Sequence, residues 1–197
     1  MLVEQDTYTT IKGVAEGYYT EKRSKFYAFA HHVTSVEEVK SLNQMYRKKY
    51  YDARHVCYAY RLLSDGSLYR ANDDGEPSGT AGKPILGALL SQSLTEVVIY
   101  IIRYYGGVNL GTGGLVTAYR EAAMDALSHA EREEKLVEEE VEYTFAYPLM
   151  NSVMRVVKEM QPRIVRQDFK ATCSITLSIR LSQAEELRQR LAKLSFT

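Results

Sequence analysis

Residues that could bind an anion are concentrated in two glycine-rich segments, Asp73–Gly82 and Gly106–Gly114, which hold eight of the twelve glycines. Glycine permits positive φ and a close approach of the main chain to a ligand, and is entropically unfavourable where neither is needed. The second segment follows an apolar run and precedes a predicted helix, so it could present free helix N–H groups to a phosphate. A tight turn packed against other backbone would need the same glycines, and both interpretations stay open.

The candidate anion-binding residues are small, hydroxylic or cationic members of these segments and their flanks: Ser78, Gly79, Thr80, Lys83, Arg103, Gly106, Gly107, Gly111, Thr112, Gly113 and Gly114. Two nucleotide motifs do not fit. GxGxxG has Val116 at the place of its last glycine, and a P-loop starting at Gly106 has Thr112 in place of lysine.

Acid–base chemistry could come from His55 and from the carboxylates Asp73, Asp74 and Glu76, although none is a firm catalytic residue. The carboxylates lack EF-hand spacing, and bonding of Asp to its own backbone in a turn explains them more simply. His55 and Cys57 share a face of one predicted strand, where core packing and a local hydrogen bond are favoured over a nucleophile–base pair. No Cys/His cluster has zinc spacing, so neither a metal nor a cofactor is predicted.

Sequence patterns predict the elements that hold these residues. A capping box at Ser35–Glu38 opens a helix to about Lys49. The run Glu96–Arg103 predicts a strand covered on both faces. The other predicted elements of this half are two strands between Tyr8 and Val33 meeting around Thr20–Ser24, a strand at His55–Leu62, a hairpin turn at Ser64–Ser67, and helices at Pro84–Ser93 and Leu115–Ala130.

The charge-dense segment His129–Glu142 predicts a boundary between domains at 1–132 and 133–197. After it come a strand at Val141–Tyr147, a helix from Pro148, a hairpin of Arg163–Phe169 with Ala171–Leu181, and a helix opened by a capping box at Ser182–Glu185. This βαββα order predicts a small ferredoxin-like plait whose last strand is short or missing. The expected fold class is α+β.

Composition bounds the functional class. Hydrophobic residues make up 45% and charged residues 25%, as in globular proteins. The net charge is zero, so an RNA contact would have to come from a local patch such as Lys22–Lys25 or Arg47–Lys49. No apolar run reaches the roughly 20 residues of a membrane helix, and the first ten residues lack a signal-peptide core. With two distant cysteines, for which a disulfide is the less favoured alternative, these features predict a cytoplasmic protein without a membrane partner.

Four segments together closely resemble the YigZ/IMPACT ("imprinted ancient") family in its bacterial two-domain type: SKFYAFAHHVTSVEEV, YYDARHVCYAYRL, RANDDGEPSGTAGKPIL and VVIYIIRYYGGVNLGTGGLVTAYREAA. The resemblance spans about Ser24–Ala130, and the remainder resembles the small second domain of bacterial members. The family's motif residues map onto His55, Asp73, Asp74, Gly75, Glu76, Pro77, Ser78, Gly79, Thr80, Gly82, Arg103, Tyr104, Gly106, Gly107, Leu110, Gly111, Gly113 and Gly114.

The resemblance implies a βαβ-rich first domain, like domain IV of elongation factor G and the second domains of ribosomal proteins. It also implies a ferredoxin-like second domain, similar to domain V of that factor. It also implies a link to translational regulation, with no firmly assigned enzymatic activity. Eukaryotic relatives carry an additional N-terminal partner-binding domain that this sequence lacks, so their kinase-pathway role is not expected here.

Three functions remain in view. The leading hypothesis is a translation-associated regulator that binds the ribosome or RNA through the glycine-rich loops. The alternatives are a hydrolase or transferase acting on a phosphorylated small molecule, and a regulatory module for a protein partner. The oligomeric state stays open.

Overall fold

The computed structural model describes residues 6–170 and 172–196, which form two compact units. One unit is Tyr8–Lys135, and the other joins the described residues of 136–197 to those of the first seven. Each unit has its own hydrophobic core and is described by itself. Within the described residues, no helix has the length and apolar character that crossing a membrane requires.

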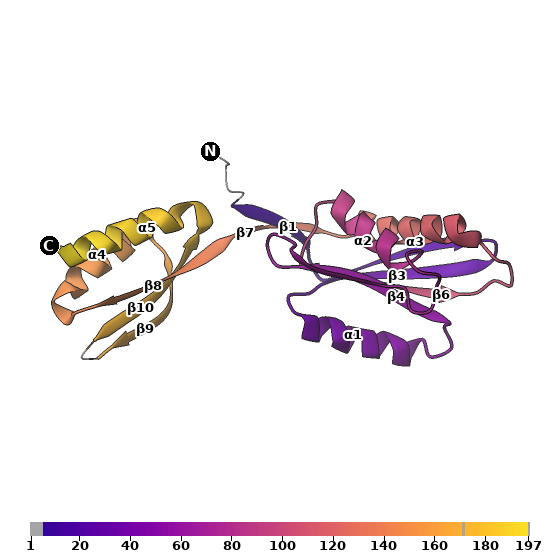
Figure 1. The fold of residues 1–197 in the computed structure, drawn as a ribbon, viewed down its shortest axis with the longest axis horizontal. Coiled ribbons are helices and arrows are strands. Elements are labelled where there is room, and N and C mark those ends of the chain that lie inside the picture. Colours follow the sequence, from indigo (N-terminus) through magenta and orange to yellow (C-terminus); the bar gives the residue numbers. More distant parts are fainter. Residues whose placement is uncertain (1–5, 171, 197) are drawn as a thin grey trace. The chain divides into compact units, whose positions relative to one another are not determined.

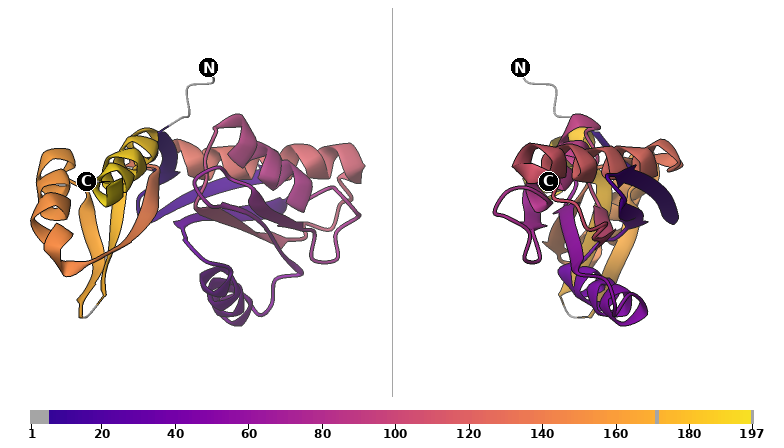
Figure 2. Two further views of the ribbon diagram at one scale, coloured as in Figure 1. Left: turned by 60° about the vertical axis from the view of Figure 1, so that its left-hand side comes forward. Right: turned by 90° about the vertical axis from the view of Figure 1, so that its right-hand side faces the viewer.

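The first unit is built on a five-stranded antiparallel sheet of order β2-β3-β6-β4-β5. Helix α1 covers one face, and α2 and α3 cover the other (Figures 1 and 2). Strands β1 and β7 form a separate pair. The elements are β1 (Thr7–Ile11), β2 (Val14–Glu21), β3 (Ser24–His32), α1 (Val36–Lys49), β4 (His55–Leu62), β5 (Leu68–Asn72), α2 (Gly82–Ser91), β6 (Val97–Tyr104), α3 (Gly111–Ser128) and β7 (Arg132–Leu136).

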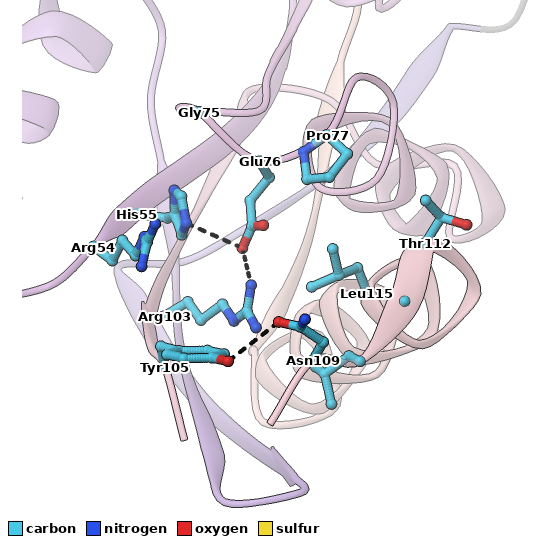
Figure 3. A pocket seen from close by; sticks show the side chains of 12 residues that line it. Arg54, His55, Gly75, Glu76, Pro77, Arg103, Tyr105, Asn109, Thr112 and Leu115 are labelled. Carbon is cyan, nitrogen blue, oxygen red and sulfur yellow. Dashed lines mark hydrogen bonds and ion pairs between the residues drawn. The ribbon is translucent and has the colours of Figure 1, made fainter. Parts of the chain in front are cut away.

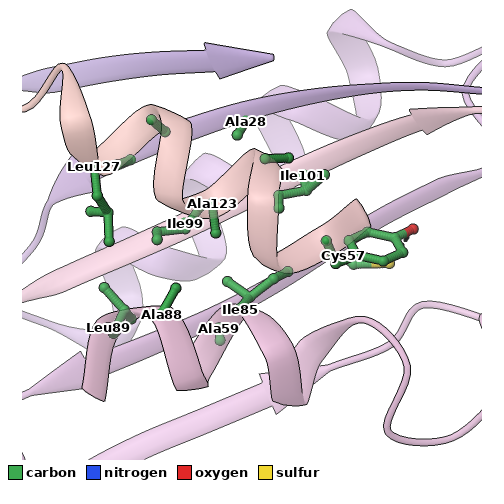
Figure 4. Packing of buried hydrophobic residues seen from close by; sticks show 14 of the residues in the cluster. Ala28, Cys57, Ala59, Ile85, Ala88, Leu89, Ile99, Ile101, Ala123 and Leu127 are labelled. Carbon is green, nitrogen blue, oxygen red and sulfur yellow. Dashed lines mark hydrogen bonds between the residues drawn. The ribbon is translucent and has the colours of Figure 1, made fainter. Parts of the chain in front are cut away.

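Strand β6 is the centre of this sheet. Its residues Val97–Arg103 are all buried, so the expected strand covered on both faces is confirmed. On one side Ile99 and Ile101 lie beneath α2 and α3 (Figure 4). The facing side of α3 carries alanines, among them Ala123 and Ala126, which let the helix approach the sheet closely.

Local capping fixes the start of α1. The Ser35 side chain accepts a hydrogen bond from the backbone N–H of Glu38 at 3.2 Å, as the capping box predicts. The Glu38 carboxylate reaches back to Thr34, accepting from its hydroxyl at 2.9 Å. The helix then packs Val39 and Tyr46 against the sheet.

The second unit has a three-stranded antiparallel sheet of order β8-β10-β9 and one core shared with its two helices. Its elements are β8 (Glu138–Phe145), η1 (Tyr147–Leu149), α4 (Met150–Met160), β9 (Arg163–Phe169), β10 (Cys173–Arg180), α5 (Leu181–Lys193) and η2 (Leu194–Phe196). The predicted hairpin is present, although Ala171 lies outside the described residues.

The capping box predicted at Ser182–Glu185 is wrong. Helix α5 begins at Leu181, so Ser182 lies inside its first turn. The backbone N–H and the hydroxyl of Ser182 both donate to the carboxylate of Asp6, at 2.8 and 2.5 Å. A carboxylate distant in sequence therefore satisfies the helix start.

Candidate anion-binding site

A cavity of about 460 Å³ lies where four parts of the first unit meet. Its wall is formed by the start of β4, the β5–α2 loop, the end of β6 and the start of α3 (Figure 3). His55 and Arg103 are register partners on neighbouring strands, which brings both to this end of the sheet. The lining residues are Arg54, His55, Gly75, Glu76, Pro77, Arg103, Tyr105, Asn109, Leu110, Gly111, Thr112 and Leu115.

A buried ion pair forms the floor of the site. Arg103 Nη1 donates to Glu76 Oε1 at 2.6 Å, and the two side chains are only 7% and 3% exposed. The hydroxyl of Tyr119 donates to the same oxygen at 2.8 Å. The charge of Glu76 is therefore compensated, and its Oε1 is held by two donors.

The orientation of His55 follows from its backbone contact. Its Nδ1 lies 2.7 Å from the carbonyl oxygen of Asp74. Because a carbonyl only accepts, Nδ1 carries a proton and donates, which leaves Nε2 facing Glu76 Oε1 at 3.7 Å. The ring is thus fixed in one orientation at the cavity wall.

Cys57 does not form a nucleophile–base pair with His55. Its thiol donates to the carbonyl of Asp73 at 3.0 Å and lies 3.4 Å from the hydroxyl of Tyr119. Burial raises the pKa of the Cys57 thiol well above its usual range, so the thiol stays protonated. The structure therefore agrees with the core-packing interpretation of this cysteine.

The two aspartates hold the loop and are not part of the cavity wall. The carboxylate of Asp73 accepts from the backbone N–H groups of Gly79, Ala81 and Gly82, at 2.9, 3.1 and 2.8 Å, so it occupies the start of α2. The carboxylate of Asp74 accepts from the N–H of Val56 at 2.7 Å and pairs with Arg47. This is turn and capping chemistry, which leaves His55 and Glu76 as the acid–base candidates that reach the cavity.

The remaining candidates of the first loop lie outside the cavity wall. Thr80 is buried, and its hydroxyl donates to the carbonyl of Pro77 at 2.6 Å. Ser78 and Lys83 are exposed. The wall takes from this loop only Gly75, Glu76 and Pro77.

The glycines of the second segment, Gly106–Gly114, have different roles: one permits close backbone packing and another lines the cavity. A Cβ on Gly106 would lie 2.2 Å from the backbone carbon of Arg23, so this glycine permits close backbone packing. Gly111 has φ +73° and lines the cavity with Thr112. Gly113 and Gly114 line a second, smaller cavity of about 220 Å³. Gly107 lines neither of these two cavities.

Helix α3 begins at Gly111, four residues before the predicted start at Leu115. Its first turn has no side-chain cap and no acidic residue. The first N–H groups of a helix have no partner within it and carry a partial positive charge. This end of the cavity is therefore suited to an anion.

Sequence reasoning missed four lining residues, Arg54, Tyr105, Asn109 and Leu115, the last of which it placed only on the apolar side of a helix. Arg54 and Tyr105 immediately flank the ends of β4 and β6, next to the predicted His55 and Arg103. Their position in the sequence could have indicated them, because the start of one strand and the end of its antiparallel neighbour meet at the same edge of a sheet. Asn109 carried no comparable signal.

Over residues 6–170 and 172–196, no group of three or more His, Cys, Asp or Glu side chains is placed to hold a metal ion. Cys57 and Cys173 are both buried free thiols.

Comparison with known proteins gives consistent matches. The Impact N-terminal domain matches residues 22–127. The IMPACT family member YigZ of Escherichia coli is 31% identical over 176 residues, which are 88% of this chain and 86% of that protein. An IMPACT family member of Haemophilus influenzae is 33% identical over 176 residues, covering 88% and 85%. A crystal structure described as that of a hypothetical protein superposes with a TM-score of 0.76 at 29% identity, over 97% of this chain and 94% of that one. The resemblance inferred from the four sequence segments is confirmed, and the chain belongs to the IMPACT family.

Proposed function

We propose that this protein is a translation-associated regulator that binds the ribosome or RNA through the cavity at the start of α3. The translational context is the one that the family resemblance implies. The observation that carries the proposal is the convergence of His55, the Asp73–Gly82 loop and the start of α3 on one cavity with Arg54 and Arg103. An uncapped helix start beside two guanidinium groups favours an anionic ligand such as phosphate.

The carboxylates of the site are poorly placed to act as a general base, which favours binding over catalysis. Oε1 of Glu76, its oxygen nearest to His55, is already held by Arg103 and Tyr119, and Asp73 and Asp74 are held by the backbone. A general base needs a free acceptor within hydrogen-bond reach of the proton it removes.

The enzyme alternative rests on one observation, the placement of His55 Nε2 at the cavity wall near Glu76. It requires His55→Ala to abolish turnover of a phosphorylated small molecule without unfolding the protein. If the variant only melts earlier, His55 is structural.

Ribosome co-sedimentation at moderate salt tests the proposal. The native protein should co-sediment, and Arg54→Ala should weaken this because an exposed cation of the cavity is lost. Lys83→Ala is the matched control, since it removes one exposed cation outside the cavity wall. An equal loss of co-sedimentation in both variants would indicate that the binding surface includes α2. No co-sedimentation of the native protein under any condition would exclude the ribosome as its ligand.

The proposal also includes three features of the architecture. They are domains at 1–132 and 133–197, a first domain like domain IV of elongation factor G, and a ferredoxin-like second domain. The order β8-α4-β9-β10-α5 with sheet order β8-β10-β9 supports the last of these. A cytoplasmic location belongs to the same proposal, with protein partners as the alternative ligand class.

A further inference from the structure

An exposed aromatic ring stands in the wall of the cavity. Tyr105 is 44% exposed, and its ring centroid lies 5.7 Å from Cζ of Arg103 and 6.0 Å from Cζ of Arg54. Its hydroxyl donates to Asn109 Oδ1 at 3.1 Å, which fixes the direction of the ring (Figure 3). A fixed, partly exposed aromatic ring beside guanidinium groups provides a surface on which a nucleobase can stack.

A polar subsite lies next to this ring. Nε of Arg103 is buried and has no hydrogen-bond partner among the described residues, in a residue that is only 6% exposed and lines the cavity. A buried donor without a partner is unfavourable, and a ligand oxygen would satisfy it. Gly111 and Thr112, in the first turn of α3, line the same cavity, and that turn has no side-chain cap. The aromatic surface and the donors are therefore within reach of one small ligand.

The charge balance limits the ligand to about one phosphate. Arg103 is neutralised by Glu76, whereas Arg54 has no carboxylate partner among the described residues. One uncompensated cation and a helix start suit a single phosphate group, and the chain as a whole has no net charge to attract a duplex. The volume of about 460 Å³ is that of a site for a small ligand.

We infer that the cavity binds one nucleoside monophosphate unit, with its base stacked on Tyr105 and its phosphate at the start of α3. This inference rests on the binding function proposed above and names its ligand. Unpaired RNA supplies such units, and a free mononucleotide has the same chemistry. Duplex RNA does not present its bases in this way, because they stay stacked within the helix.

Calorimetric titration with four ligands tests this inference: an unstructured pentaribonucleotide, its duplex, a nucleoside monophosphate and inorganic phosphate. The pentaribonucleotide should bind, whereas the duplex and phosphate alone should bind much more weakly. A mononucleotide that binds as tightly as the strand supports the inference and makes the free nucleotide the source. Phosphate that binds as tightly as the mononucleotide overturns it, because the base then contributes nothing.

Two pairs of variants locate the contacts. Tyr105→Leu should weaken binding about ten- to a hundred-fold through loss of stacking. Tyr105→Phe keeps the ring and loses only the hydrogen bond to Asn109, so it should bind much more tightly than Tyr105→Leu. Arg54→Ala should reduce the salt dependence, whose slope of log K against log salt should be about −0.7 in the native protein. Arg70→Ala, an exposed cation of β5 outside the cavity wall, should leave the slope unchanged. Native-like affinity of Tyr105→Leu would overturn the inference.

The failure of this inference can be distinguished from failure of the proposed function. If the native protein co-sediments with ribosomes but binds neither the strand nor the mononucleotide, the ligand assignment is wrong and the function stands. If it binds the strand in a Tyr105-dependent way but never co-sediments, the ligand assignment stands and the ribosome is excluded.

Discussion

Replacement of Glu76 by alanine should destabilise the first unit by several kcal/mol. The change leaves the Arg103 guanidinium, with a side chain only 7% exposed, without its carboxylate. Removing one partner of a buried pair typically costs about 3–5 kcal/mol. The Tyr119 hydroxyl also loses its acceptor, which adds about 1 kcal/mol. The two terms share one oxygen atom and will not add fully, so about 4 kcal/mol is expected.

Urea unfolding followed by circular dichroism measures this loss, and hydrogen exchange shows which unit is affected. Protection should fall in peptides from residues 8–135 and persist in those from 136–196, because the pair lies in the first unit. Glu76→Gln keeps an acceptor oxygen for both donors and should cost about 2 kcal/mol. Glu16→Gln, an exposed carboxylate on β2, is the control and should change stability by less than about 0.5 kcal/mol. A cost below about 1 kcal/mol for Glu76→Ala would refute the account of a buried, uncompensated cation.

Three further predictions concern packing and ionisation. Gly106→Ala should cost about 1–3 kcal/mol because its Cβ would overlap backbone, whereas Gly113→Ala, a helical position with nothing within 4 Å, should stabilise by up to about 1 kcal/mol in thermal unfolding. Cys57 should resist thiol reagents at about pH 8 until the protein unfolds, since burial raises the pKa of its thiol; rapid labelling of the native protein would contradict this. Burial also raises the pKa of Tyr100 and of Tyr119, so the folded state keeps protons that the unfolded state releases above about pH 10. Stability should hold below that pH and fall above it, with tyrosinate absorbance rising together with unfolding and not before it.

Local patterns predicted most of the elements correctly where the governing interaction is itself local. The buried strand β6 follows from its own apolar run, and the Ser35–Glu38 capping box joins residues three apart in the sequence. Both predictions are confirmed. The Ser182–Glu185 pattern failed because the group that satisfies the helix start, Asp6, is 176 residues away. No pattern around residue 182 contains that information.

The start of α3 shows a different limit. Three glycines among its first four residues lower the local helix propensity, so the sequence predicts a start at Leu115. In the fold the helix begins at Gly111, where φ is positive. The site was predicted in the same incomplete way: the glycine-rich segments were identified, but which of their residues line the cavity depends on the antiparallel pairing of β4 with β6.

The contact of Asp6 with Ser182 makes the second unit discontinuous along the chain. At about 5–20 residues per second, Asp6 is synthesised roughly 10–35 s before Ser182. Once Lys135 has been added, the first unit has all of its residues. The second unit still lacks helix α5, and with it Ser182, the partner of Asp6. Removal of Asp6 by truncation at the N-terminus should therefore destabilise the start of helix α5. In a fragment that starts at residue 136, the exposed N–H group and hydroxyl of Ser182 would bond to water in place of the Asp6 carboxylate.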